Sequence, residues 1–289
     1  SSRLLSRIEQ KRFGKKNMCI AVFIWKAHPL YPFLLFLNRD EYHNRPTKPL
    51  SWWEDSDILG GRDEVAGGTW LACTRTGRLA FLTNVREINS NSHTKSRGDL
   101  PLRFLKSVKS PHDFSEQLLK EAGEYNGFNL IVADLCSMTM LYITNRPKHT
   151  GMSVTEVSPG IHVLSNATLD SPWPKSQRLE YSFKQLLDEY GESEIPIGHA
   201  AERIMRDLAK EDSNLPGIYS PECEYQLSSI FVDTEMSMGR FGTRSTSSLA
   251  VRSSGDATFY EVYLEKDVWK EQQMTFVIEK MIDGVVSTS

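Results

Sequence analysis

Two nearly continuous apolar runs near the start of the chain constrain its fold most strongly. They span residues 19–25 and 33–37, and the second follows closely after two turn signals that contain proline. Apolar runs of this length between turn residues are typical of strands that are buried on both faces. We therefore expect two buried strands in one sheet.

Four amphipathic helices are predicted from the spacing of apolar residues. The first lies near residues 100–108, and the second begins at Ser110-Pro111, a cap residue followed by a first-turn proline. The third spans residues 179–190 and the fourth residues 204–208. We expect the first two helices to cover the same face of a sheet.

The remaining apolar segments predict further strands, with hairpin turns at Thr76-Gly77 and Ser254-Gly255. These strands span residues 68–74, 79–83, 128–133, 138–144, 161–164, 229–232, 247–251, 258–264 and 274–278. Blocks of strands separated by pairs of helices favour an α+β fold, in which layered antiparallel sheets are covered by helices, over a doubly wound parallel sheet.

Composition excludes several classes of protein. A length of 289 residues with 39% hydrophobic residues and a net charge of −3 favours one domain without the basic stripe of a nucleic-acid-binding protein. The four cysteines form no CxxC pair, so neither a metal site nor a disulfide framework is indicated. No nucleotide-binding glycine loop is present, and no apolar run reaches the ~18 residues of a membrane span. We expect no cofactor, and the sequence carries no signal for an oligomeric state.

The first 17 residues differ from the rest of the chain. They are basic and contain a single acid, Glu9, without an apolar segment typical of secretion signals. Both an organelle transit peptide and a translated leader before Met18 fit this composition. In either case we expect residues 1–17 to be disordered, residues 18–282 to form the domain and residues 283–289 to be a tail.

Met18-Cys19 opens the first apolar run. If Met18 is the start of translation, or if the preceding segment is removed, Cys19 carries both a thiol and a free α-amine. An α-amine titrates near pH ~7.7–8.0 and a thiol near ~8.5, so the amine can accept the thiol proton without a histidine. The alternative is a buried strand cysteine that serves as a small apolar residue.

A polar tetrapeptide, Asn38-Arg39-Asp40-Glu41, ends the second apolar run. The end of a strand at the rim of a sheet is a common position for catalytic groups, although a charged turn there needs no function. The tetrapeptide occurs together with Met18-Cys19 and with several further short motifs. These are Gly60-Gly61-x-Asp63, Gly67-Gly68-Thr69-Trp70, Leu82-Thr83-Asn84, Tyr125-Asn126-Gly127-Phe128-Asn129, Leu164-Ser165-Asn166, Pro172-Trp173 and Gly242-Thr243-Arg244.

This combination of motifs closely resembles the NRDE family, whose eukaryotic members are homologues of transport and Golgi organization protein 2. The resemblance extends from Met18 to about Glu279. It implies a fold similar to that of N-terminal-nucleophile hydrolases such as bile salt hydrolases, penicillin V acylases and acid ceramidase. In that αββα fold, two stacked antiparallel sheets lie between layers of helices.

The resemblance also implies roles for five residues. Cys19 resembles the N-terminal nucleophile, and Asp40 resembles the aspartate that holds its α-amine. Asn84 and Asn166 resemble asparagines that stabilise an oxyanion, although both could instead cap turns. Arg244 resembles an arginine that favours the thiolate, although it could instead pair with a rim carboxylate.

One position departs from the bile salt hydrolase pattern. There an arginine lies three residues before the aspartate, whereas this chain has Leu37 at that position and Arg39 beside Asp40. Neighbouring strand residues face opposite sides, so we expect that Arg39 need not reach the thiol if Asp40 does. This difference leaves open whether the chain keeps the amidase chemistry.

Two functional classes therefore stay open. One is a trafficking and Golgi-organization factor that carries a hydrophobic or acyl ligand, with acyl-CoA and haem as candidates and with Asn38, Arg39, Asp40 and Glu41 as binding residues. The other is a hydrolase of acyl amides or thioesters that uses Cys19. The histidines occur singly, without a haem-attachment signature. We expect a cytoplasmic protein, with a mitochondrial location or attachment to the Golgi as alternatives.

Overall fold

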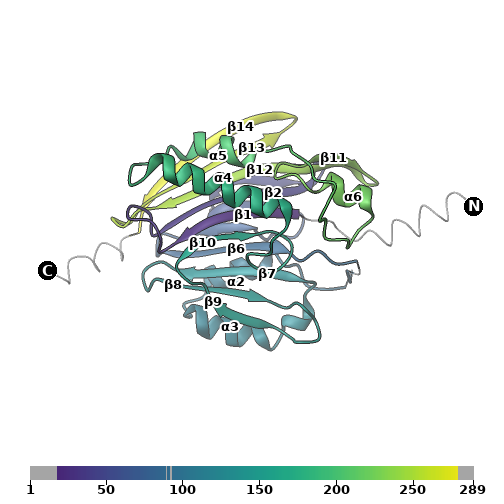
Figure 1. The fold of residues 1–289 in the computed structure, drawn as a ribbon. Coiled ribbons are helices and arrows are strands. Elements are labelled where there is room, and N and C mark those ends of the chain that lie inside the picture. The colour runs from purple at the N-terminus through teal and green to yellow at the C-terminus, as the bar shows by residue number, and fades with distance from the viewer. Residues whose placement is uncertain (1–17, 89, 92, 279–289) are drawn as a thin grey trace, which may run out of the picture.

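The computed structural model describes residues 18–88, 90–91 and 93–278. These residues form two seven-stranded sheets that are stacked face to face, and helices cover the outer face of each sheet (Figure 1). Neighbouring strands pair antiparallel throughout, as in the pairing of β1 with β2 and of β6 with β7. The predicted α+β arrangement of four layers is therefore confirmed.

The first sheet has the strand order β10-β1-β2-β12-β13-β14, and β11 also pairs with β12. Two of its inner strands, β1 and β2, are the two apolar runs recognised in the sequence. The strands are β1 (Met18–Trp25), β2 (Phe33–Tyr42), β10 (Gly160–Leu164), β11 (Asp233–Met236), β12 (Gly239–Val251), β13 (Asp256–Glu265) and β14 (Val268–Val277).

The second sheet is a meander in which each strand pairs with the next along the chain. The predicted hairpin around Gly77 is present, and that glycine has a positive φ of 81°. The strands are β3 (Thr47–Trp52), β4 (Leu59–Asp63), β5 (Leu71–Cys73), β6 (Arg78–Asn84), β7 (Phe128–Asp134), β8 (Thr139–Thr144) and β9 (Ser153–Glu156).

Helices seal the two outer faces. In Figure 1, α4 (Pro174–Tyr190) and α5 (Ile197–Met205) lie over the first sheet, whereas α2 (Asp99–Lys106) and α3 (Pro111–Leu119) lie over the second. The Ser110 hydroxyl accepts a hydrogen bond from the backbone of Asp113 and so caps α3, as the Ser-Pro signal predicted. The short elements η1 (Ala122–Glu124) and α6 (Pro221–Gln226) complete the set.

The core explains why β1 has no polar alternation. Ala21 and Phe23 face the second sheet, whereas Ile20 and Val22 face α4 and α5. Both faces of β1 are thus buried, and each large apolar side chain removed from water contributes about 1.5–3 kcal/mol. The continuous apolar run is the sequence signature of this central position.

Some expected elements are absent or differ in extent. Residues 229–232 do not form a strand, and the fourth helix ends at Met205, so that Leu208 lies outside it and is 63% exposed. The second apolar run does not end before the tetrapeptide, because β2 continues through it to Tyr42 and pairs there with β1 and β12.

The expectations for residues 1–17 and 283–289 lie outside the described residues. Among the helices of the described part, none is long and apolar enough to cross a membrane.

Candidate functional site

A cavity of about 700 Å³ opens between the two sheets at the carboxyl end of β2. The first sheet contributes Cys19 from β1, and the second contributes Leu82 and Asn84 from β6. The segment that leads from β6 to α2 closes one side. The lining residues are Cys19, Arg39, Asp40, Glu41, Arg45, Asp63, Val65, Ala66, Thr69, Trp70, Leu82, Asn84, Ser90, Asn91, Thr94, Lys95, Ser96, Arg97, Gly98 and Asn126.

Cys19 lies at the inner end of this cavity and is 5% exposed. It shares the inward face of β1 with Ala21. Burial and the nearby Asp40 carboxylate raise the pKa of the Cys19 thiol to about 12. At neutral pH the thiol is therefore protonated while Cys19 remains joined to Met18.

Met18 is itself enclosed. Its side chain is 1% exposed and packs in an apolar socket with Tyr42, Leu227 and Phe241. The Arg86 guanidinium lies 3.3 Å from the Met18 sulfur. The bond between Met18 and Cys19 is consequently held inside the fold rather than on its surface.

Arg39 shares the cavity with the thiol, contrary to the expectation from its position beside Asp40. It pairs directly with Cys19 across the two strands, and directly opposite residues of an antiparallel pair project from the same face. Its guanidinium stacks over the Trp70 ring at 4.1 Å. Burial lowers the pKa of Arg39, because a positive charge in this position is poorly solvated.

Asp40 faces the other side of β2, toward the helices. The Thr243 hydroxyl donates to its Oδ1 at 2.7 Å, and its Oδ2 is buried without a hydrogen-bond partner among the described residues. Burial raises the pKa of Asp40, and the charge of Lys175 opposes that rise. The backbone of Asp40 is hydrogen-bonded to the Cys19 thiol, whereas its carboxylate acts on the thiol through its charge.

Asn38 does not reach the cavity. Its amide donates to the backbone carbonyls of Met205 and Ile230, at 2.8 and 3.0 Å, and the Thr246 hydroxyl donates to its oxygen at 2.6 Å. Buried amides need such partners, so Asn38 ties β2 to the end of α5 and to the following segment. It holds the strand in position rather than contacting a ligand.

The two asparagines proposed for an oxyanion site come together. Asn166 donates through its side chain to the backbone carbonyl of Asn84 at 2.8 Å, and its own oxygen accepts from the Ser165 hydroxyl. The Asn166 amide is thus committed to the backbone, whereas Asn84 lines the cavity. The structure places Asn84, and not the Asn166 side chain, where it could contact a bound molecule.

Arg244 lies apart from the thiol. It is at an irregularity in the pairing of β12 with β2, and its guanidinium donates to the carbonyls of Tyr42 and Arg45 at 3.3 and 2.5 Å. It is not among the described residues that line the cavity. Of the five residues given catalytic roles, Cys19, Asp40 and Asn84 line the cavity, and the side chain of Asp40 points to the other face of β2.

Apart from Arg39, the sequence analysis did not predict the cations of the cavity, which are Arg45, Lys95 and Arg97. Arg45 forms a bidentate pair with Asp63, at 2.8 and 2.6 Å, and lies 3.5 Å from Glu41. Lys95 pairs with Glu121 and Glu124. These two cations already have counter-charges.

Arg97 differs from them. It donates to the carbonyl of Gly127 at 2.8 Å, and among the described residues it makes no ion pair. Burial lowers its pKa to about 10. Within the described part of the chain, the buried Arg39 and the half-buried Arg97 are therefore guanidinium groups at the cavity without a paired carboxylate.

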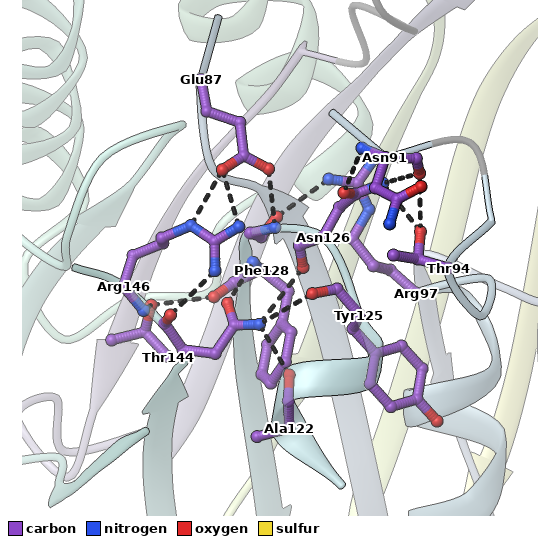
Figure 2. A network of polar contacts seen from close by, with 12 residues as sticks. Glu87, Asn91, Thr94, Arg97, Ala122, Tyr125, Asn126, Phe128, Thr144 and Arg146 are labelled. Carbon is purple, nitrogen blue, oxygen red and sulfur yellow. Dashed lines mark hydrogen bonds and ion pairs between the residues drawn. The ribbon is translucent and has the colours of Figure 1, made fainter. Parts of the chain in front are cut away.

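The segment that carries Arg97 is held in place by Asn126, as Figure 2 shows. Asn126 exchanges hydrogen bonds of 2.9 Å with the backbone of Asn91 and donates to the Thr94 hydroxyl at 2.8 Å. In the same view, Glu87 joins Arg146 through two hydrogen bonds. The motif around Asn126 thus shapes the cavity wall, a role that no local sequence signal reveals.

The two stacked antiparallel sheets between helix layers, with a cysteine from an inner strand in the cavity, define an αββα-layered protein. The family model for Transport and Golgi organisation 2 matches residues 18–266. The chain belongs to this family.

Three relatives illustrate the match. The Transport and Golgi organization 2 homolog of Mus musculus is 31% identical over 281 residues, covering 91% of this chain and all of the relative. The Homo sapiens homolog is 30% identical with the same coverage. The Drosophila melanogaster protein is 23% identical, covering 84% of this chain and 91% of the relative.

Solved structures with similar architecture include two hydrolases. A mutant conjugated bile acid hydrolase from Clostridium perfringens has a TM-score of 0.48 at 10% identity, covering 91% of this chain and 94% of the other. The N-acylethanolamine-hydrolyzing acid amidase ortholog of Caenorhabditis elegans has a TM-score of 0.37 at 11% identity, covering 80% and 92%.

Proposed function

We propose that this protein is a carrier that binds an anionic acyl compound, such as acyl-CoA, in the cavity between its two sheets. The observation that supports this function is the pair of guanidinium groups without an ion-pair partner among the described residues, the buried Arg39 and the half-buried Arg97. Burying an unpaired charge is costly, and a phosphate or carboxylate of a ligand would offset that cost through charge-assisted hydrogen bonds.

The apolar part of such a ligand would contact Trp70 and Leu82, which also line the cavity. Haem, the other cargo candidate, is less well matched, because no histidine is among the cavity-lining residues described. Like the relatives named for transport and Golgi organization, this carrier would serve transport and Golgi organization. We place it in the cytoplasm, with mitochondrial or Golgi attachment as alternatives.

A titration with palmitoyl-CoA, followed by tryptophan fluorescence, tests the carrier function. Arg39→Met is expected to weaken binding about 10-fold or more, because a hydrogen bond to a charged group contributes roughly 1.5–3 kcal/mol. Arg62→Met is the matched control, since Arg62 stacks on Trp53 at 4.5 Å and does not line the cavity. Equal affinities of wild type and Arg39→Met would contradict the proposal.

A second function, hydrolysis of an acyl amide or thioester, is favoured by the Oδ2 of Asp40, which has no partner among the described residues. Met18 lies opposite Asp40 in the strand register, so removal of Met18 would create an α-amine next to this carboxylate. That amine could take the thiol proton, the thiolate would attack the acyl carbon, and the amine would return the proton to the leaving group. Water would then release the acid from the thioester.

Intact mass and thiol labelling of protein purified from its native source test this second function. The hydrolase requires a chain that begins at Cys19 and a thiol that reacts with iodoacetamide near neutral pH. If the protein retains Met18 and Cys19 resists labelling, the hydrolase function is excluded and the carrier function is the one of the two that remains.

A further inference from the structure

The ring of Trp70 supports the Arg39 guanidinium inside the cavity. The guanidinium carbon lies 4.1 Å from the ring centroid, and the two residues are 7% and 5% exposed, respectively. Both residues line the cavity. A guanidinium that stacks through its face on an aromatic ring can still donate from its N–H groups in its own plane.

Backbone contacts hold Trp70 in place. Its carbonyl accepts a hydrogen bond of 2.8 Å from the N–H of Leu82, and the Thr69 hydroxyl shares its proton between the carbonyls of Gly61 and Leu71, at 2.7 and 3.1 Å. A Cβ at Gly61 would lie 2.4 Å from the Cζ2 and Cη2 atoms of the Trp70 ring. The edge of the ring therefore rests on the backbone of β4, and only glycine leaves room for it there.

The N–H groups of Arg39 are left for a ligand. Among the described residues, none accepts a hydrogen bond from Arg39 or forms an ion pair with it, and its nitrogens are not among the atoms that are sealed off without a partner. Glu41, on the same face of β2, is engaged elsewhere, because its Oε1 accepts from the N–H of Tyr42 at 2.8 Å and its Oε2 lies 3.5 Å from Arg45. The Arg39 nitrogens therefore open into the cavity.

We infer that Trp70 is a positioning residue that orients Arg39 to bind an oxyanion head group through two N–H groups in the guanidinium plane. The inference deepens the proposed carrier function and rests on it. Because Arg39 is directly opposite Cys19 in the strand pairing, the head group lies beside the thiol. Carboxylates and phosphates both match this planar pair of donors. Selection of the anion then depends on the geometry that Trp70 imposes, and not on charge alone.

Isothermal titration calorimetry on the full chain tests this inference with octanoate, octyl phosphate and octan-1-ol. The three probes share an alkyl chain and differ in the head group. The wild type should bind at least one of the anions about 10-fold more tightly than the alcohol, and the tighter anion identifies the head group. In Trp70→Leu the affinity for that anion should fall about 10-fold, because the stacking surface is lost, while the affinity for octan-1-ol changes less than about 3-fold. Trp70→Phe keeps a ring and should restore most of the preference. Equal losses for all three probes would overturn the inference.

Gly61→Ala approaches the same ring from behind. Its methyl group must displace Trp70, so the preference for the anion over octan-1-ol should fall as in Trp70→Leu. Gly198→Ala is the matched control, since a Cβ there would lie 3.2 Å from the ring of Tyr260 and neither of these two residues lines this cavity. Gly198→Ala should leave the preference unchanged.

Arg39→Lys remains informative if these variants do not fold. Lysine keeps the charge but lacks a planar pair of donors, so the affinity for the anion should fall about 10-fold. Unchanged affinity would overturn the inference, because charge alone would then be sufficient. Binding of palmitoyl-CoA without a preference for either octyl anion over octan-1-ol would overturn the inference alone. Absence of binding by palmitoyl-CoA and by all three probes would instead contradict the carrier function itself.

Discussion

The tetrapeptide Asn38-Arg39-Asp40-Glu41 serves two sides of one strand. Arg39 and Glu41 line the cavity between the sheets, whereas the Asn38 and Asp40 side chains project toward the helices. The alternation of a strand produces this division, because successive side chains point to opposite faces. Substitutions in the tetrapeptide should therefore separate into ligand-binding and supporting effects.

Asn126 illustrates a supporting effect. Asn126→Ala removes the hydrogen bonds to Asn91 and Thr94, and we expect a loss of about 1–3 kcal/mol in the free energy of unfolding. Backbone amides of residues 93–98 should also exchange hydrogen faster, as measured by mass spectrometry. Gln185→Ala, on the exposed side of α4, is the control and should change neither quantity appreciably.

Residue motifs predicted only part of the site. Cys19, Arg39 and Asn84 stand in recognisable motifs and do line the cavity. Arg97 could not be predicted in this way, because it comes from a segment far along the chain and carries no local signal. Its importance arises from partial burial and from the absence of a paired carboxylate among the described residues, which are properties of the folded chain.

At the scale of elements, a close contact of two glycines connects the second sheet to its covering helix. Gly68 precedes β5, and Gly98 precedes α2. The Thr69 N–H donates to the Gly98 carbonyl at 3.0 Å. A Cβ at Gly68 would lie 2.5–2.8 Å from backbone atoms of Gly98, which leaves no room for a side chain.

Gly68→Ala should therefore destabilise the protein by about 1–3 kcal/mol, because backbone segments must move apart to accept the methyl group. Stability is measured by chemical denaturation, and the slope of the free energy of unfolding against denaturant concentration should not change. Gly123→Ala is a suitable control, since a Cβ there meets no atom within 4 Å and the residue is not among the glycines with positive φ. Equal stabilities of the two variants would show that the Gly68–Gly98 contact is not tight.

Helices and strands were predicted correctly where burial produces a recognisable spacing of apolar residues. The fully buried strands β1 and β2 and the amphipathic α4 follow from apolar spacing alone. Strands β3, β4, β9 and β11 were missed, and of these β9 is exposed and β3 is half-exposed, so neither carries such a pattern. Within residues 229–232, Ile230 packs against α5 and its carbonyl accepts a hydrogen bond from Asn38, so its burial does not come from strand pairing.

At the scale of the whole molecule, a buried carboxyl group joins the two sheets. Glu261 of β13 is 1% exposed, and its Oε2 accepts a hydrogen bond of 2.6 Å from the backbone of Leu50 in β3. Gln272 of β14 donates to the same oxygen at 3.3 Å. Burial raises the pKa of Glu261 above its ordinary value, and these hydrogen bonds oppose the rise.

This shift gives a pH dependence of defined sign. A carboxyl group with a raised pKa binds more protons in the folded than in the unfolded state, so the free energy of unfolding falls as pH rises from about 4.5 through the folded value. Glu261→Gln keeps the acceptor for Leu50 and should show a smaller fall. The pKa of Asp40 is raised in both the wild type and Glu261→Gln. The difference between their free energies of unfolding, followed against pH, therefore isolates the contribution of Glu261. Parallel curves would contradict this assignment.

The cavity has walls from both sheets, with Cys19 and Arg39 on one side and Trp70 and Leu82 on the other. A molecule that fills the cavity must contact both sheets at once and would stabilise their packing against each other. Ligands of this protein can therefore be identified by thermal denaturation. A ligand that binds in the cavity should raise the melting temperature roughly in proportion to the logarithm of its concentration. This measurement does not require a known chemical reaction.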